Sequence, residues 1–454
     1  MKKICLLLAV SAAALIAAGD DVKVTFEKYK LKNGMRVILA PDNSVPVVSV
    51  YVLYNVGSRS EERGRTGFAH LFEHMIFEGS ANAPKGVHFK SVEANGGSLN
   101  GSTHPDFTDY FEVLPSNKLA VGLWLESDRM RSLAITDENL NNQKEAVKAE
   151  RRLSFDNRPY NTAVIDTWPQ MAYKNWQSSH SLIGSFEDLS ASSVADVAKF
   201  FKTYYAPNNA ILCIAGDIRI PEAKKWIEGY FGDIAAQPQP QRPDLTEPSA
   251  LEARDDVYKD KLARVPAVLI GWPGPPRRSA DYNALVMADV LLTGGESSRF
   301  QQDLVKGKQS VLSYDANPGW PFASASDYKD PALYAMEVMY NPKFTGQDIV
   351  EQVQGEIAKI QNNGVEAKEL DRARTFLKAQ RIKELQTSLT RARLLAQYEM
   401  FDGNPGLITT ELNDFLSVTG EQIQATMKKY LVPERRVTLN ILPVPKEATS
   451  KEKK

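Results

Sequence analysis

Two histidines and a glutamate lie within one short stretch of the sequence, GFAHLFEHMIF at residues 67–77. His70 and His74 are four positions apart, and Glu73 directly precedes the second histidine. Residues three and four positions apart share one face of a helix, so these three side chains are expected to project together. Two imidazoles one turn apart can hold a zinc ion, and the carboxylate beside them can take a proton from water whose pKa the metal lowers. The spacing therefore predicts metal-dependent hydrolysis.

A catalytic zinc site needs about three protein ligands, so a third must come from elsewhere in the chain. Well-placed carboxylates are candidates, as are the remaining histidines, His88, His104 and His180. Among the carboxylates, Glu150 is attractive because it lies in the predicted helix NQKEAVKAERRL. The apolar side of that helix is formed by Ala146, Val147, Ala149 and Leu153. A carboxylate near an apolar side needs a partner, because burying it alone is costly, and a metal ion would be such a partner.

The amino-acid composition is that of a globular protein. Apolar residues make up 43% of the 454 residues and charged residues 24%, and the length predicts two or three domains. The net charge of −1, without a basic stripe or a phosphate-binding loop, argues against nucleic acid as a partner.

Residues 1–19 read as a signal peptide. The basic start MKK is followed by the apolar run ICLLLAVSAAALIAA, which is too short for a comfortable membrane span, and by small residues up to Gly19. An uncleaved anchor is the alternative. The simple form of the signal predicts export to a bacterial periplasm, with no stable membrane span after cleavage. Cys213 is then the remaining cysteine, and its apolar surroundings predict a buried, inert thiol.

The chain divides near its middle. A proline-rich linker at 237–249 is predicted to separate a zinc-binding catalytic domain at 20–236 from a second domain at 250–446, and 447–454 reads as a disordered tail. Both halves contain an apolar strand, a turn and a helix, followed by long amphipathic helices. We therefore expect an α+β fold with two homologous domains, each a largely antiparallel sheet packed with helices, produced by internal duplication.

The stretch NVGSRSEERGRTGFAHLFEHMIFEGS contains H-x-x-E-H, the inverzincin signature. It resembles the pitrilysin/insulinase family of zinc metallopeptidases, in particular the bacterial relatives of the mitochondrial processing peptidase. Three further stretches extend the resemblance over most of the chain: NGGSLNGSTHPDFTDYFEVLP, NQKEAVKAERR and YYAPNNAILCIAGDI. The resemblance implies that His70, His74 and Glu150 bind one zinc ion per chain and that Glu73 is the general base. Where some members carry an acidic residue, this chain has Gln143, an amide that can hydrogen-bond a ligand but adds no negative charge.

The segment ANGGSLNGSTHPDFTDY reads as a turn followed by a strand. The resemblance implies that peptide substrates add to this strand as an extra one, held by main-chain hydrogen bonds. Asn100, Gly101 and Ser102 are therefore the predicted substrate-binding residues, and Gly101 would let another backbone come close. An ordinary edge strand without this role is the alternative.

Active relatives also use an Arg and a Tyr that face the zinc across a chamber. Here Val305 stands where the Arg is expected, Arg299 precedes it, and Tyr314 is displaced. The missing pair predicts a hetero-dimer with a related subunit that lacks the zinc motif, with a homodimer as the competing prediction. The alternative function is a non-catalytic or peptide-binding scaffold subunit.

The turn GWPGPPRRSADY in the second half contains two adjacent arginines, Arg277 and Arg278. A rigid turn that carries two solvated charges is the simpler interpretation, and a ligand contact is the alternative.

Overall fold

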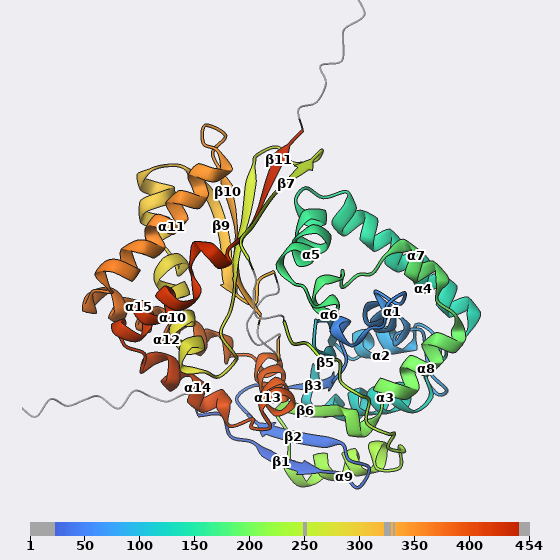
Figure 1. Cartoon of the computed structure of the whole chain (residues 1–454). Coiled ribbons are helices and arrows are strands. Elements are labelled where there is room, and N and C mark those ends of the chain that lie inside the picture. Colours follow the sequence, from blue (N-terminus) through green and yellow to red (C-terminus); the bar gives the residue numbers. More distant parts are fainter. Residues whose placement is uncertain (1–22, 248–251, 322–327, 330–331, 445–454) are drawn as a thin grey trace, which may run out of the picture.

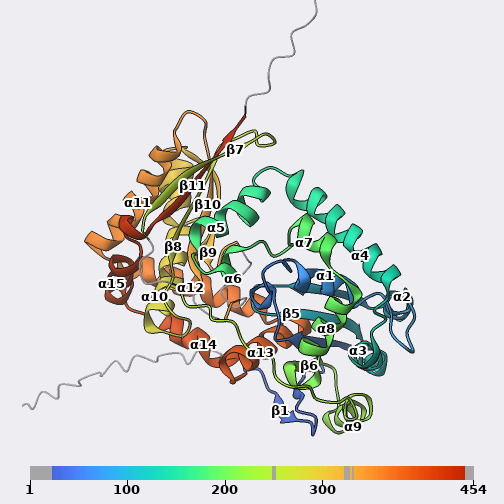
Figure 2. The ribbon, with the colours of Figure 1, turned by 45° about the vertical axis from the view of Figure 1, so that its right-hand side comes forward.

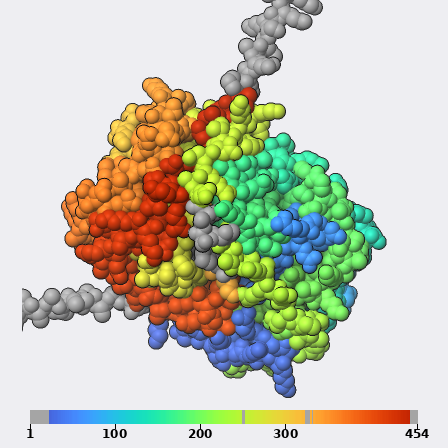
Figure 3. Space-filling view, viewed as in Figure 1, coloured from blue at the N-terminus to red at the C-terminus, as the bar shows by residue number. Residues whose placement is uncertain are grey.

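The computed structural model of the chain describes residues 23–247, 252–321, 328–329 and 332–444 (Figure 1). The predicted signal peptide and C-terminal tail, and the last two residues of the predicted linker, lie outside these ranges. Two sheets, each with its own helices, make up the two halves of the molecule, and Figure 3 shows the halves in broad contact on one face.

The strands of the first sheet are β1 (Glu27–Lys30), β2 (Arg36–Pro41), β3 (Val47–Tyr54), β4 (Ser98–Thr103), β5 (Thr108–Pro115) and β6 (Ala210–Gly216). Those of the second sheet are β7 (Arg254–Asp260), β8 (Ala267–Pro273), β9 (Val311–Pro318), β10 (Leu333–Tyr340) and β11 (Val437–Pro443).

The helices of the first half are α1 (Phe68–Met75), α2 (Val87–Ala94), α3 (Leu119–Ser132), α4 (Asp137–Glu150), α5 (Trp168–Ala172), α6 (Trp176–Ser179), α7 (Phe186–Ala191), α8 (Val194–Tyr204) and α9 (Ile220–Phe231). Those of the second half are α10 (Ala280–Thr293), α11 (Gly346–Asn363), α12 (Ala367–Glu384), α13 (Ser388–Asp402), α14 (Leu407–Leu416) and α15 (Gly420–Tyr430). Within the described ranges, no helix combines the length and the hydrophobicity that crossing a bilayer requires.

The two sheets share one topology. The order β2-β6-β3-β5-β4 in the first sheet corresponds strand for strand to β7-β11-β8-β10-β9 in the second, and β1 is an additional strand beside β2. In each sheet the strand that comes first in the chain pairs in parallel with the one that comes last, β2 with β6 and β7 with β11. The other pairs among these five strands are antiparallel. The predicted α+β class, with two homologous antiparallel-rich domains, is confirmed.

The central strands of the first sheet are buried on both faces. β3 and β6 consist mainly of aliphatic and β-branched residues, a composition that fits a strand covered on both sides. Cys213 lies within β6, buried and unpaired with another cysteine, as predicted. Helices α1, α3, α8 and α9 contribute to the core on one face of this sheet.

Each half covers the second face of the other half's sheet. Helix α13, from the second half of the sequence, packs under the first sheet, where Leu395 and Tyr398 join Tyr51 in one core (Figure 1). In return, residues 163–172 of the first half pack on the second sheet (Figure 2). Gly271 in β8 makes room for Trp168, because a Cβ atom there would stand 2.7 Å from the indole Cζ2. On one face of each sheet, the core therefore needs residues from both halves of the chain.

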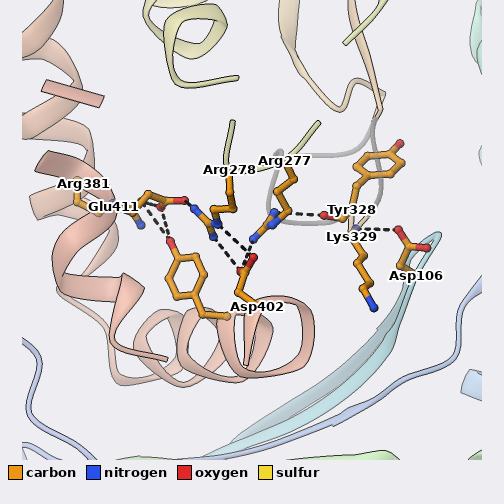
Figure 4. A network of polar contacts seen from close by, with 9 residues as sticks. Asp106, Arg277, Arg278, Tyr328, Lys329, Arg381, Asp402 and Glu411 are labelled. Atoms are coloured by element: carbon orange, nitrogen blue, oxygen red, sulfur yellow. Dashed lines mark hydrogen bonds and ion pairs between the residues drawn. The ribbon is translucent and has the colours of Figure 1, made fainter. Parts of the chain in front are cut away.

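Polar contacts hold the arginine turn of the second half to α13 and α14 (Figure 4). Arg278 donates to Asp402 at 3.0 and 3.2 Å and also to Glu411, and Arg277 donates to Asp402 at 3.3 Å. The side chains of Arg277 and Arg278 are only 9% and 25% exposed, so the prediction of two solvated charges is wrong. The acidic partners come from α13 and α14, more than a hundred residues away in sequence, and no local pattern in the turn indicates them.

The same contacts reach the first half through Arg277, which donates to the carbonyl of Tyr328 at 3.2 Å. The next residue, Lys329, donates its backbone N–H to Asp106 in the turn between β4 and β5 at 2.9 Å. Asp106 also accepts from Arg59 at 3.1 Å. Polar contacts thus extend from the arginine turn to the segment that precedes α1.

The proline-rich segment forms neither helix nor strand in its described part, 237–247. Asn208 exchanges two hydrogen bonds with the backbone of Gln237, and the carboxylate of Glu247 accepts from the backbone of Lys174 and Asn175. The segment is therefore fastened to the first half at both ends, while the exact domain boundaries remain a prediction.

Candidate metal centre

Helix α1 brings the two motif histidines to one point. Their rings are 4.8 Å apart, centre to centre, with His70 buried and His74 partly exposed. Burial, together with the neighbouring His74, lowers the pKa of His70 to about 4, so its imidazole is neutral at physiological pH. A neutral imidazole has a free lone pair on one nitrogen, which is the form that binds a metal.

Glu150 meets the histidines from the end of α4. One of its carboxylate oxygens lies 3.1 Å from Nε2 of His74 and 3.7 Å from Nε2 of His70. Across the described residues, these three form the group whose ligand atoms all lie within 4.8 Å of one another. The hydrogen bond from His74 lowers the pKa of Glu150, which keeps the carboxylate ionised. Two imidazole nitrogens and one carboxylate oxygen that converge in this way fit the donor set of a catalytic zinc ion.

The backbone changes from α-helix to π-helix directly after Glu150, over Arg151–Asp156. This change rotates the following residues, and Leu153, expected on the apolar side of the helix, is instead 67% exposed. Val147 is buried as expected. Single π-helical turns within α-helices often mark functional sites, and this one starts at the residue after the predicted third ligand.

Glu73 points from α1 toward the end of β4. Its carboxylate accepts a hydrogen bond of 2.7 Å from the hydroxyl of Thr103, the last residue of that strand. Burial raises the pKa of Glu73 to about 7, although the bond from Thr103 opposes the rise. A carboxyl group with a pKa near neutrality can both accept and return a proton. Thr103 was not among the predicted site residues; its only sequence signal is its place two residues after Gly101, on the same side of the strand.

Gln143 lies behind His74. Its amide oxygen is 3.2 Å from Nδ1 of His74, and its amide nitrogen donates to Glu78 at 2.7 Å. Glu78 in turn pairs with Lys85. Nδ1 can donate to Gln143 whether or not Nε2 carries a proton, so the amide would keep Nε2 directed toward Glu150 when a metal ion takes the place of the Nε2 proton. The amide thus orients a predicted ligand. Glu78, three residues after the end of α1, was not recognised from the sequence.

The other three histidines have different partners. His88 is buried against Glu112, with 2.9 Å between Nε2 and a carboxylate oxygen. His104 stacks on Phe107, and His180 lies against Trp176. None of the three belongs to the group formed by the predicted ligands within the described residues.

The predicted substrate strand β4 is an edge strand that pairs with β5 alone. Asn100 is exposed, whereas Gly101 faces inward: a Cβ atom there would stand 2.9 Å from the ring of Tyr110. The hydroxyl of Ser102 bonds His104 at 2.9 Å and also Asp109. What this edge can offer a peptide is therefore its backbone, because the side-chain positions of Gly101 and Ser102 are already occupied by internal contacts.

Comparison with known proteins shows which family has this architecture. The family model described as Insulinase (Peptidase family M16) matches residues 36–185, and the model described as Peptidase M16 inactive domain matches residues 192–377. The chain belongs to the M16 peptidase family. This M16 chain is 28% identical over 448 residues to the zinc protease PqqE of Helicobacter pylori, covering 96% of this chain and 98% of the relative. It is 23% identical over 363 residues to the human mitochondrial-processing peptidase subunit beta, covering 79% of this chain and 72% of the relative.

Solved structures agree with this assignment. The crystal structure of a protease from Helicobacter pylori matches with a TM-score of 0.86 at 26% identity, covering 93% of this chain and all (100%) of that one. The periplasmic protease PqqL from Escherichia coli matches with a TM-score of 0.74 at 18% identity, and there this M16 chain spans 92% of its own length but 48% of PqqL. The latter similarity concerns the fold alone.

The second domain of this M16 chain carries no histidine, since the last one in the sequence is His180. Arg299 is held by Glu369 through two hydrogen bonds of 2.8 Å, and the hydroxyl of Tyr314 lies 3.1 Å from that of Ser298. Val305 packs against the core of the same domain. These three residues thus have their partners within the second domain.

Proposed function

We propose that this chain is a zinc-dependent endopeptidase that cleaves extended peptides. The convergence of His70, His74 and Glu150 carries the proposal, since it unites two helices that are far apart in sequence around one point. The names of the relatives support it, because PqqE of Helicobacter pylori is called a zinc protease. A zinc ion held by these three residues would lower the pKa of water and polarise the scissile carbonyl.

The chain's own residues would handle the proton. Glu73 lies beside His74 and takes a proton from the attacking water, then returns it to the leaving amine. Thr103 keeps the Glu73 carboxylate in place through its 2.7 Å hydrogen bond. Gln143 orients His74 so that its Nε2 faces the metal position. His70 is held more rigidly, because it is buried within the packing of α1.

Peptide substrates would add to the edge of β4. Asn100, Gly101 and Ser102 would contribute main-chain hydrogen bonds, which hold an extended segment with little regard to its sequence. Thr103 ends the strand and contacts Glu73, so a peptide paired along β4 would run toward the general base. This arrangement favours unfolded segments over folded proteins as substrates.

Replacing Glu73 by Gln tests the chemistry. An amide can still accept from Thr103, so the fold and the bound zinc should persist while hydrolysis of a quenched peptide falls by about 10²- to 10⁴-fold. Zinc content would be measured by elemental analysis, with His70→Ala as the variant expected to lose the metal. The parent activity should also disappear with a chelator and return with zinc. An active Glu73→Gln variant, or a parent without zinc, would contradict the proposal and leave the scaffold interpretation.

We further propose that a partner chain completes the active site. Arg299 and Tyr314 are engaged within the second domain, so the electrostatic help that a developing oxyanion needs would come from another subunit. The match to about half of PqqL (48%) supports an assembly of two such chains. A related subunit without the zinc motif is the favoured partner, and a second copy is the competing one. Peptidase activity should rise on adding the partner; full activity from a monomer in solution would exclude both assemblies.

We propose a periplasmic location, which rests on the N-terminal signal alone. Fractionation of the native host, with N-terminal sequencing of the mature protein, tests it. A protein found in the cytoplasm with its first 19 residues intact would contradict the proposal.

A further inference from the structure

The start of helix α1 lacks a cap of its own. The first N–H groups of a helix have no partner within it and usually bond to a side chain at the residue before the helix. Here that residue is Gly67, which has no side chain and adopts the left-handed conformation with φ at 81°. Only glycine fits this place, because a Cβ atom would stand 2.5 Å from the carbonyl oxygen of Ile183.

The buried carboxylate of Glu61 serves as the cap instead. One of its oxygens accepts from the backbone N–H of Gly67 at 2.9 Å, and the other accepts from Ala69 at 2.7 Å. Glu61 is only 4% exposed. Both oxygens therefore hold the first turn of the helix, and Ala69 is the residue directly before His70.

The start of α1 is also linked to α4, the helix that ends with the third predicted ligand, Glu150. Gly184 packs backbone to backbone on Gly67, since a Cβ atom on Gly184 would stand 2.5 Å from the Gly67 Cα. Arg151, the residue after Glu150, donates to the carbonyl of Gly184. The start of α1 and the end of α4 are thus fixed to one another where Glu61 holds the backbone.

We propose that Glu61 is a positioning residue of the metal centre, an inference that rests on the proposed zinc chemistry. Its two oxygens set the rotation and axial position of α1, and with them the place of both imidazoles relative to Glu150. Burial raises the pKa of Glu61, and the hydrogen bonds from the backbone of Ala69 and Gly67 oppose this rise, so the role rests on the two acceptor positions. A Ser or Thr cap at position 67 is excluded by the contact with Ile183, so the acceptors for these N–H groups come from Glu61.

The test compares Glu61→Gln with Glu62→Gln, a matched change at the neighbouring residue, whose side chain is 78% exposed. Gln retains the shape of Glu61 but replaces one of its two acceptor oxygens by an N–H donor. We expect the zinc dissociation constant of Glu61→Gln, measured by competition with a chelator, to be roughly ten- to hundredfold above that of the parent. The visible spectrum of the cobalt-loaded protein should shift as well. Glu62→Gln should match the parent in both measurements.

Two further variants separate positioning from general stability. Ile423→Val, in the fully buried core of the second domain, should lower the melting temperature without changing zinc affinity. Glu61→Asp retains both acceptor oxygens but is one methylene shorter, so it should bind zinc with intermediate affinity. It also replaces Glu61→Gln in the comparison if that variant does not fold.

The outcomes distinguish this inference from the proposed function. A parent that binds no zinc overturns both. A parent that binds zinc, with Glu61 variants within twofold of its dissociation constant, overturns the positioning role alone. The same follows if Ile423→Val weakens zinc binding as much as Glu61→Gln does at an equal loss of melting temperature.

Discussion

Replacing Gly101 by Ala should destabilise the first domain and leave substrate binding unchanged. The new methyl carbon would lie 2.9 and 3.0 Å from two ring carbons of Tyr110, well inside the contact distance of about 3.5–4.0 Å between carbon atoms. Tyr110 cannot move aside easily, because it is fully buried, its hydroxyl lies 3.0 Å from that of Tyr205, and the guanidinium of Arg129 covers its ring. Overpacking of this kind costs about 1–3 kcal/mol.

The assay is thermal unfolding followed by calorimetry, together with KM for a quenched peptide. The expected loss is a few degrees in melting temperature, with KM within twofold of the parent, because the methyl group would point at the buried ring of Tyr110. Gly229→Ala is the control: it lies within α9, where a Cβ atom would meet nothing within 4 Å, and should be neutral or stabilising by up to about 1 kcal/mol. A raised KM at unchanged melting temperature would mean that position 101 faces the substrate and that this reasoning is wrong.

Two further predictions concern the stability of the fold. A fragment ending at residue 249 should expose the sheet face that α13 covers, so it should bind a hydrophobic dye and lack a cooperative transition; a cooperatively folded fragment would show that the halves do not depend on each other. Burial, aided by the charge of Arg129, lowers the pKa of His88 to about 3, against about 6.5 when unfolded, so the unfolded chain binds more protons between these values. The free energy of unfolding should therefore fall by up to about 1.4 kcal/mol for each unit that the pH drops from 6.5 toward 3. His88→Gln, which can still donate to Glu112, should lessen this slope in urea titrations, and an equal slope would refute the assignment.

The conclusions that follow from local sequence are those set by spacing along one element. A spacing of four positions between two histidines places them on one helical face wherever that helix lies. The strand and helix periodicities indicated the α+β class, and their repetition in the second half indicated the duplication. In the same way, the apolar run around Cys213 was enough to predict a buried thiol. Such inferences need no knowledge of which elements meet.

Apart from Glu150, which was expected as the third ligand, the contacts between distant segments were not predicted from the sequence. The turn at Arg277 and Arg278 reads as solvated until Asp402 and Glu411 approach it from helices more than a hundred residues later. Gly101 reads as an opening for a ligand until Tyr110 fills the space beside it. In both cases the deciding partner is brought by packing, which local patterns do not encode.

The sequence by itself determined the chemistry that this chain can offer: two imidazoles and a carboxylate on one turn of a helix, within a duplicated α+β fold. Only the tertiary structure decided how that turn is held. Glu61 fixes its start, Gln143 orients His74, and Glu150 reaches both rings from the end of α4. The reason is physical: helical periodicity fixes directions within one element, whereas a metal centre depends on distances between elements, and these distances are set by the packing of the two halves together.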